Sequence, residues 1–290
     1  MKADDFLNKL LEKIKVTQEE IEKAIKRKTL IKEELEKLGN LAVKDTGSFS
    51  RGTAICPIHD LDLFVVIEKG KFPNNITSLK EFFQRKIQSI VDKNCETLIG
   101  AVKGIPVLIV NHGLLIKYPR NKSQFLVDIV LAYPHESKND WFKIPDIDEI
   151  TNQNKWIETN KQDHEFEFDK AKKNSEGTII NYIKIFKYWS LINRKGKKAF
   201  NSYFLEQLIL EKLPSNSNQS KSLSKNVILL FDELSNGVID EKYQKPPYYI
   251  GNISEMELKR RNRAREFLLR DLILCNENNW SEVFNKKIKY

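Results

Sequence analysis

The stretch DLDLFVVI at residues 60–67 decides how this chain folds. Side chains on a β-strand alternate between two faces, so Asp60 and Asp62 share one face while Leu61 and Leu63 share the other. This alternation predicts a strand that buries its apolar face against a core. The two carboxylates are then presented together on the opposite face of the sheet.

Two further features lie outward from this strand. Gly47-Ser48 precedes it, at a place where a loop or a helix start can hold phosphate oxygens with backbone N–H groups. Asp128 follows it inside the apolar run FLVDIV at residues 125–130, where an unpaired charge is costly. Three carboxylates with no paired histidine or cysteine ligands suit a hard cation such as Mg²⁺. Two such ions can clamp the attacking and leaving oxygens of a phosphoryl transfer.

The composition is that of a globular protein that can bury a sizeable core. The chain has 290 residues, of which 40% are apolar and 31% charged. No apolar run approaches the length of a membrane span, and the N-terminal MKADD opens no signal peptide, so we expect a cytoplasmic protein without a membrane partner. Three scattered cysteines, Cys56, Cys95 and Cys275, predict neither a disulfide framework nor a zinc pair.

The order of periodic segments predicts an α+β protein. Helical spacing covers residues 5–38, interrupted near residue 16 by the capping-box pattern of Thr17 and Glu20. A second such pattern, Ser78 with Glu81, predicts the start of another helix. Three apolar segments joined by turn residues then predict hairpin strands, at residues 105–110, 114–118 and 125–133.

The second half of the chain is predicted to be mostly helical. Residues 134–177 are polar and irregular, which predicts a crossover between lobes. Helical patterns follow at residues 178–193, 202–213, 223–235 and 254–276. We therefore expect a mixed-sheet core with an N-terminal helical spine over residues 1–150, and a helical C-terminal lobe over residues 151–290.

The order of Gly47-Ser48, then Asp60 with Asp62, then Asp128 resembles the DNA polymerase β-like nucleotidyltransferase superfamily. That superfamily carries a Gly-Ser loop, an Asp-x-Asp on the next strand and a third Asp on a later strand. Three stretches are also similar to the branch that holds oligoadenylate synthases, cyclic GMP-AMP synthase and the bacterial CD-NTases: GSFSRGTAI at 47–55, YIKIFKYW at 182–189 and NSYFLE at 201–206. In that branch one helix carries Lys-x-Trp, and Ser-Tyr opens the next helix. The resemblance covers roughly residues 40–210.

The resemblance implies a catalytic role in metal binding for the three aspartates. Asp60 and Asp62 are expected to bind two Mg²⁺ ions, with Mn²⁺ as the alternative metal. Asp128 is expected to bind the ion that acidifies the attacking ribose hydroxyl, which then displaces pyrophosphate in line. Taken singly, each aspartate also fits a salt bridge or a turn.

The resemblance also implies nucleotide-binding roles for Gly47, Ser48, Lys187, Ser202 and Tyr203. Ser48, Lys187 and Ser202 are expected to bind the triphosphate, and Tyr203 is expected to stack on a base. Each has a structural alternative from the residues alone. Ser48 fits a helix N-cap, Lys187 fits a surface lysine beside an apolar stripe, and Tyr203 fits a core aromatic.

The implied function is that of a CD-NTase, which joins NTP substrates into a cyclic di- or trinucleotide. Such enzymes make signals in bacterial anti-phage defence, and the product acts on a downstream effector protein. A linear oligonucleotide synthase and an RNA-tailing nucleotidyltransferase remain alternatives. The archaeal type of tailing enzyme carries further domains that we do not expect here. An RNA-binding module with a decayed site is the non-enzymatic alternative, against which the intact aspartates argue.

The net charge of +9 leaves two interpretations open. Two basic clusters, Lys23, Lys26, Arg27 and Lys28 in one helix and KRRNRAR at residues 259–265 in another, can contact nucleic-acid phosphates. The wider family receives double-stranded nucleic acid on its N-terminal helices, which implies a structured RNA activator. The alternative is that both clusters are solvated helix faces. Base identity, linkage, ring size and oligomeric state are not determined by the sequence.

Overall fold

The computed structural model describes residues 2–94, 105–118, 125–147, 153–193, 202–213, 221–240 and 255–285. The chain forms two compact units: a sheet unit, Val16–His164, and a helical unit, Met1–Lys15 with Glu165–Tyr290. The sequence-based division placed one boundary at 150/151 and kept the first helix with the sheet. The compact units instead group that helix with the C-terminal helices, because its apolar stripe packs there.

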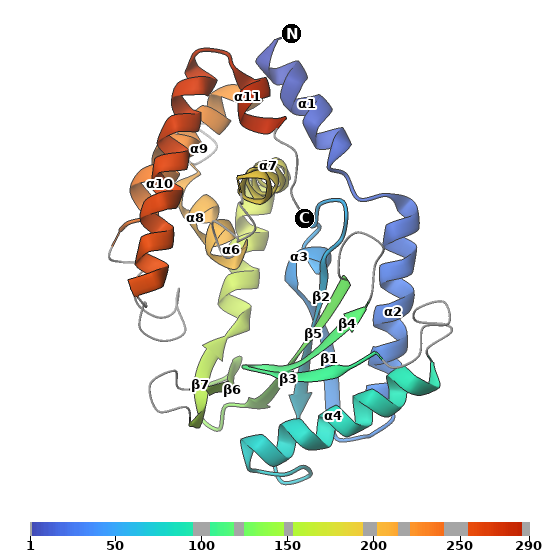
Figure 1. Ribbon diagram of the computed structural model, residues 1–290. Coiled ribbons are helices and arrows are strands. Elements are labelled where there is room, and N and C mark those ends of the chain that lie inside the picture. The colour runs from blue at the N-terminus through green and yellow to red at the C-terminus, as the bar shows by residue number, and fades with distance from the viewer. Residues whose placement is uncertain are drawn as a thin grey trace. The chain divides into compact units, whose positions relative to one another are not determined.

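The sheet unit is built on a seven-stranded mixed sheet, as predicted (Figure 1). Its strands run in the order β1-β2-β5-β4-β3, with β6 paired to β5 and β7 to β6. β2 is parallel to β5, whereas β1 is antiparallel to β2 and β4 is antiparallel to β5. The strand bounds are β1 Leu41–Thr46, β2 Asp60–Ile67, β3 Val107–Val110, β4 Gly113–Tyr118, β5 Phe125–Pro134, β6 Trp141–Ile147 and β7 Asn154–Asn160.

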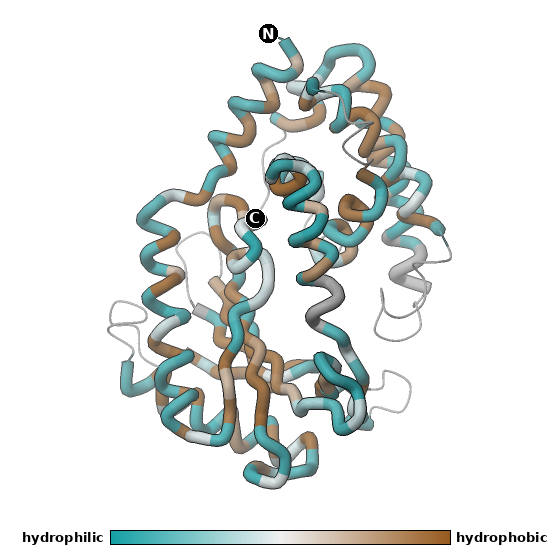
Figure 2. Tube along the Cα trace, turned by 180° about the vertical axis from the view of Figure 1, so that it is seen from behind, coloured by the Kyte–Doolittle hydropathy of each residue, from teal (hydrophilic) through white to brown (hydrophobic). Residues whose placement is uncertain are grey.

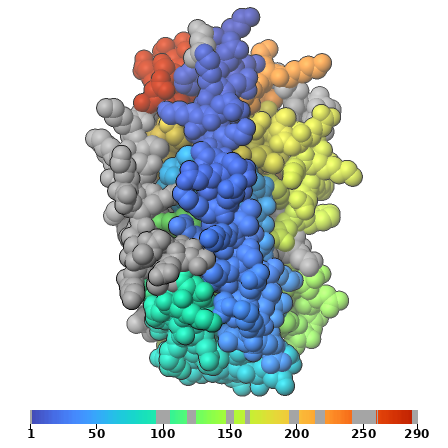
Figure 3. All heavy atoms as spheres, turned by 90° about the vertical axis from the view of Figure 1, so that its right-hand side faces the viewer, coloured from blue at the N-terminus to red at the C-terminus, as the bar shows by residue number. Residues whose placement is uncertain are grey.

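One face of this sheet is covered by two helices, α2 (Gln18–Glu36) and α4 (Ile76–Lys93). Their apolar side chains form one core with Leu61, Leu63 and the inward residues of β5. Figure 2 shows the central strands as largely hydrophobic, and Figure 3 shows α2 and α4 side by side on the surface of this unit. The face opposite to the helices is therefore the one that carries Asp60 and Asp62.

The helix starts follow local capping chemistry, with one exception to the prediction. Thr17 and Glu20 form the predicted capping box at the start of α2. The predicted box of Ser78 and Glu81 is wrong, because α4 begins at Ile76, three residues before the start that this box would give. There the Asn75 side chain accepts a hydrogen bond from the Ser78 N–H at 3.2 Å.

The prediction of an irregular crossover over residues 134–177 is wrong. This segment forms the β6–β7 hairpin and α6 (Lys161–Asn174), and β1 was also not predicted. β7 is half-exposed and rich in polar residues, and α6 has only a weak apolar stripe, so neither shows clear periodicity. Pairing from Trp141↔Asn160 to Ile147↔Asn154 holds the hairpin together instead.

The helical unit consists of helices packed around α7. The predicted helices are confirmed, and a short one after them was not predicted; the bounds are α1 Ala3–Lys13, α7 Ile179–Ile192, α8 Ser202–Lys212, α9 Leu223–Gly237, α10 Glu255–Asn276 and α11 Trp280–Phe284. α7 is buried on nearly all sides, as an all-round apolar helix must be (Figure 1). Its Phe186 packs on Phe231 of α9 with ring centroids 4.8 Å apart. None of the helices among the described residues has the length and apolar composition needed to cross a membrane.

Candidate active site

Asp60, Asp62 and Asp128 lie on one face of two neighbouring strands. Asp62 of β2 and Asp128 of β5 are direct partners in the parallel register, and partners in a ladder point to the same face. Asp60 lies two residues earlier on β2 and so shares that face. All three side chains are half-buried, whereas Leu61 and Leu63 on the opposite face are fully buried.

The charges on this face disfavour one another. Burial raises the pKa of the Asp128 carboxyl above its usual range. His112 acts in the opposite direction, and the Asp60 carboxylate raises the pKa of Asp128 further. A carboxyl whose charge is disfavoured by burial and by a second carboxylate is stabilised by a bound cation.

The Gly47-Ser48 segment lies directly beside Asp62. Thr46 ends β1 opposite Asp62, and Gly47 then begins the four-residue helix α3 (Gly47–Ser50). A Cβ on Gly47 would lie 1.6 Å from Asp62 Oδ2, and the Gly47 φ of +77° is strained for any other residue. Only glycine therefore allows the backbone to approach the carboxylate so closely.

Ser48 lies inside α3 and not at its N-cap, so the capping role considered for it is wrong. The N-cap position is Thr46, whose side chain makes no capping hydrogen bond. The Ser48 carbonyl instead accepts from the Thr53 N–H at 2.9 Å and from the Ala54 N–H at 3.1 Å. These bonds close the loop and fix Ser48 next to the aspartate face.

The three aspartates fit a divalent cation by their chemistry. They offer hard oxygen ligands on one face, with no described cysteine or histidine pair. Within the described ranges, no three His, Cys, Asp or Glu side chains lie close enough together, as they stand, to hold a metal ion. The case for cation binding by Asp60, Asp62 and Asp128 therefore rests on their chemistry and shared face, and not on a preformed ligand geometry.

Lys187 is buried in the helical unit, which excludes the surface position considered for it. Its side chain is 7% exposed and forms an ion pair with Glu206 of α8, whose side chain is 0% exposed. The carboxylate beside the lysine compensates the cost of burying an ammonium group inside the unit. Glu206 lies four residues after Ser202 in the NSYFLE stretch, but its role was not predicted.

Trp189 of the Lys-x-Trp triplet is held by a second buried carboxylate. Its Nε1–H donates to Asp271 Oδ2 of α10 at 2.7 Å, and Asp271 is fully buried. Arg270 Nε donates to the other oxygen at 2.7 Å, and Asn193 also donates to Asp271. Asp271 lies 82 residues after Trp189, so no sequence spacing could have identified it.

Ser202 and Tyr203 lie in the first turn of α8, at the helix start where they were predicted. Tyr203 is 41% exposed, so the core-aromatic alternative is wrong and the ring is accessible to a ligand. The next residue, Phe204, is buried under the Arg261 guanidinium, whose carbon lies 4.3 Å from the ring centroid. This cation–π contact holds α8 against α10, while the Tyr203 ring in the same turn of α8 stays exposed.

The two sets of predicted site residues lie in different units. Gly47, Ser48 and the three aspartates belong to the sheet unit, and Lys187, Ser202 and Tyr203 belong to the helical unit. Within the sheet unit the structure brings together the whole predicted set. Within the helical unit it places Lys187 beside α8, the helix that Ser202 and Tyr203 open.

Part of each basic cluster is engaged in contacts within the chain. Lys28 Nζ lies 2.7 Å from Asp45, Lys23 pairs with Glu19, and Arg27 lies over the Phe125 ring. In the second cluster Arg261 is 1% exposed and cannot contact a phosphate backbone in this fold. The clusters thus present fewer available charges than the sequence suggests.

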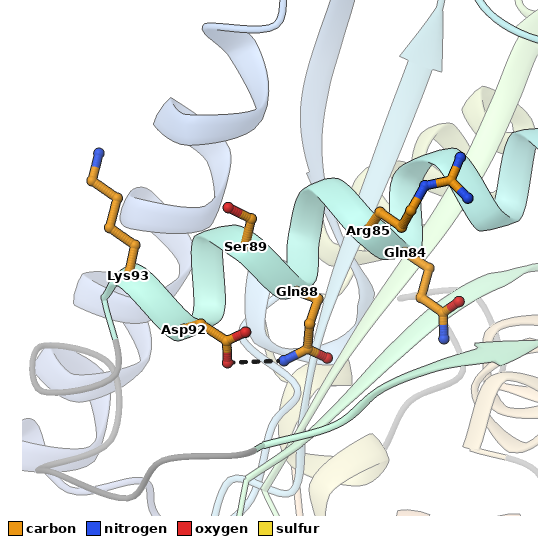
Figure 4. A pocket seen from close by; sticks show the side chains of 6 residues that line it. All are labelled: Gln84, Arg85, Gln88, Ser89, Asp92 and Lys93. Atoms are coloured by element: carbon orange, nitrogen blue, oxygen red, sulfur yellow. Dashed lines mark hydrogen bonds between the residues drawn. The ribbon is translucent and has the colours of Figure 1, made fainter.

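A shallow pocket on the sheet unit is not the candidate site. It is lined by side chains of α4, among them Gln84, Gln88 and Asp92, with Gln88 donating to Asp92 at 3.0 Å (Figure 4). Gln84 Nε2 donates to the Val107 carbonyl at 2.8 Å, and Gln88 bonds the backbone of the same edge strand, β3. Because α4 covers the apolar face of the sheet, this pocket lies away from the aspartates.

Comparison with known proteins places this geometry in a described fold. No family model matches the chain, and no curated protein is significantly similar to it. Among solved structures, Escherichia coli MS115-1 CdnC with ATP is 14% identical, with a TM-score of 0.70 over 99% of each chain. Elizabethkingia meningoseptica CdnE, a cyclic dinucleotide synthase solved with GTP and Apcpp, is 13% identical, with a TM-score of 0.64 over 94% of this chain and 99% of that one.

A third similar structure is described as a CD-NTase. Bradyrhizobium diazoefficiens CdnG, a CD-NTase solved with GTP, is 11% identical, with a TM-score of 0.64 over 98% of this chain and 96% of that chain. The similarity extends over nearly the full length in each case, so it includes the sheet and the helices together. The chain described here therefore has the fold of the bacterial CD-NTases.

Proposed function

We propose that this chain is a CD-NTase: a divalent-metal-dependent nucleotidyltransferase that joins NTPs into a cyclic di- or trinucleotide. One observation carries the proposal. Asp62 and Asp128 are register partners on parallel strands, Asp60 shares their face, and the Gly47 backbone lies against Asp62. The common fold with CdnE, a cyclic dinucleotide synthase, supports the same activity.

In this proposal Asp60, Asp62 and Asp128 hold two divalent cations, and Mg²⁺ is the first candidate for both. Such ions, when bound, neutralise phosphate charge and lower the pKa of an attacking hydroxyl. The residues of the chain do the rest by orientation. The closed Gly47–Ala54 loop positions Ser48 for a phosphate oxygen, and the strand pairing fixes the spacing of the carboxylates.

The helical unit is proposed to carry nucleotide-binding residues of its own. Lys187 provides a positive charge for the triphosphate, and Ser202 provides a hydroxyl donor. Tyr203, with its exposed ring, provides a face on which any base can stack. Ring stacking of this kind is tolerant of sequence, so it leaves the choice of base to other contacts.

The proposal extends to the biological role, the location and the partners of the protein. We infer a role in bacterial anti-phage defence, a cytoplasmic location, and a downstream effector that binds the product. CdnC of E. coli MS115-1 has been solved with a HORMA protein, so a protein partner is also compatible with this fold. Structured RNA as an activator stays a prediction, and the partly buried ion pair of Lys28 with Asp45 weakens it.

The test is product analysis. The purified chain is incubated with each labelled NTP and their mixtures, with Mg²⁺ or Mn²⁺, and products are resolved before and after phosphatase treatment. A product whose mobility phosphatase leaves unchanged identifies a cyclic nucleotide, whereas a ladder that shifts because terminal phosphates are removed identifies a linear oligonucleotide synthase. Label transferred only to added RNA identifies a tailing enzyme. The absence of any transfer with all four NTPs and both metals would contradict the proposal.

A further inference from the structure

The ion pair between Lys187 and Glu206 raises a question that the proposed function leaves open. Lys187 is the positive charge proposed for the triphosphate, yet its ammonium already contacts a carboxylate that is fully buried. Both side chains come from the interior faces of α7 and α8, so the pair is a built feature of the helical unit. A phosphate that binds Lys187 must therefore share the ammonium with Glu206 or displace it.

The surroundings of this pair are positively charged. Lys184 lies one turn before Lys187 on α7 and is half-buried. Burial lowers the pKa of Lys184, and the charges of Lys15 and Lys187 lower it further. Lys184 and Lys187 thus lie on the middle turns of α7 with Lys15 near enough to act on Lys184, and Glu206 is a buried anion beside Lys187. Without that anion, the cluster would attract a polyphosphate more strongly.

Nucleotidyl transfer makes this balance important, because the reaction releases pyrophosphate. The leaving group keeps the β- and γ-phosphates of the NTP, so a lysine that contacts either of them binds substrate and product alike. Uniformly tight binding of both lowers the KM for NTP without speeding turnover, and it slows release.

We propose that Glu206 is a positioning residue that acts through Lys187: its carboxylate holds the ammonium in place and competes with the triphosphate, which keeps pyrophosphate releasable. The inference rests on the proposed function, since it assigns a regulator of affinity to the same nucleotide site. A purely structural ion pair makes a different prediction, because it would change stability and leave phosphate affinity unaltered.

The decisive variant is Glu206→Gln in the full chain. Glutamine has nearly the same shape and can still accept a hydrogen bond from Lys187, but it carries no charge. The matched control is Glu233→Gln, which removes the carboxylate of an exposed ion pair between α9 and Lys212 of α8, at 4.0 Å. Calorimetry measures the affinity for inorganic pyrophosphate and for a non-hydrolysable ATP analogue, with Mg²⁺ present. Circular dichroism confirms that each variant is folded.

We expect Glu206→Gln to bind pyrophosphate about tenfold more tightly than the wild type, as is typical when a charged competitor for one hydrogen bond is removed. The KM for NTP should fall with it, and kcat should fall because release becomes slower. Glu233→Gln should match the wild type in all three. Unchanged or weaker pyrophosphate affinity in a folded Glu206→Gln variant overturns the inference.

A measurement on the wild type covers the case in which Glu206→Gln does not fold. In ¹⁵N-lysine-labelled protein, the Lys187 Nζ signal is assigned by its loss in Lys187→Arg, and pyrophosphate is then titrated. A shift of this signal at saturation supports a shared ammonium, and its absence overturns the inference. If wild-type protein binds neither pyrophosphate nor NTP and makes no product, the proposed function itself fails. If it binds both and only Glu206→Gln is unchanged, the inference alone fails.

Discussion

Buried charges are arranged in opposite ways in the sheet unit and in the helical unit. On the sheet, Asp60 and Asp128 raise the electrostatic energy of one another on a half-buried face. In the helical unit, the buried charges of Lys187 and Glu206 are paired, and Asp271 is held by Trp189 and Arg270. The like charges on the sheet raise the energy of one another until a cation binds, whereas the opposite charges buried in the helical unit stabilise each other, so that removing one of them costs stability. The comparison predicts different outcomes when charges are removed from the two units.

The largest effect is expected on the sheet, in activity and not in stability. Asp60→Asn or Asp62→Asn should reduce nucleotide synthesis to below about one-thousandth of the wild-type rate, because the metal-bound charge stabilisation worth several kcal/mol is lost. Product formation from labelled NTPs with Mg²⁺ measures this, and the melting temperature should not fall. Asp92→Asn, on exposed α4, is the matched control. Full activity of either site variant would remove the metal assignment.

The reverse is expected for the ion pair of the helical unit. Lys187→Met should destabilise the protein by about 3–5 kcal/mol, because Glu206 is left as a buried, uncompensated charge. The double variant Lys187→Met/Glu206→Leu should recover most of this loss, since the pair is then replaced by apolar contacts. Urea denaturation measures both. A single variant as stable as the wild type would show that the pair does not hold the helical unit together.

Alanine substitutions at two glycines of one loop distinguish a steric effect at the site from backbone strain. Gly47 (φ +77°) and Gly52 (φ +73°) both adopt left-handed conformations, so alanine costs about 1–2 kcal/mol at either position. Only at Gly47 would the new Cβ also meet the Asp62 carboxylate, whereas nothing lies within 4 Å at Gly52. We expect Gly47→Ala to be about a hundredfold less active than Gly52→Ala, since small misplacements at a reacting centre have effects of that size. Equal activities of the two variants, measured at equal stability, would contradict the role of this close approach.

The second buried carboxylate of the helical unit predicts a smaller loss of stability. Trp189→Phe keeps an aromatic ring but removes the Nε1–H that donates to Asp271. The loss should be about 1.5–3 kcal/mol, the range for hydrogen bonds to charged groups. Tyr188→Phe is the control on the same helix, because it keeps the ring under Lys13. Thermal unfolding of the two variants compares them directly, and an equal change in both would show that Asp271 does not depend on Trp189.

The smallest effect is a gain in stability on the sheet. In metal-free protein near pH 7.5, Asp128→Asn should stabilise by on the order of 1 kcal/mol, because the ionised carboxylate is disfavoured in the fold. A raised folded pKa contributes stability that is fully present below the unfolded value of about 3.9, and it is lost as the pH rises through the folded value. The advantage of the variant should therefore disappear on acidification into that window. Mg²⁺ should raise the melting temperature of the wild type more than that of the variant, and a gain that is independent of pH would contradict the assignment.

The sheet half of the site was predictable because its information is local. Alternation along residues 60–67 places Asp60 and Asp62 on one face, and an apolar run marks Asp128 as unusual. The bounds of β2 agree with that pattern, whereas the register that pairs Asp62 with Asp128 was given only by the structure. The prediction for residues 134–177 failed because β6, β7 and α6 lack strong periodicity, and the backbone pairing of β6 with β5 and β7 leaves no such pattern in the sequence.

The sequence by itself determined the α+β class, most helices and the aspartate face, since side-chain period and capping chemistry act over a few residues. Tertiary structure alone decided how charge is balanced. It placed Glu206 beside Lys187, and it brought Asp271 to Trp189 across 82 residues. It also brought the Gly47 backbone against Asp62. Electrostatic and steric partners depend on distances in space, which local spacing along a chain does not contain.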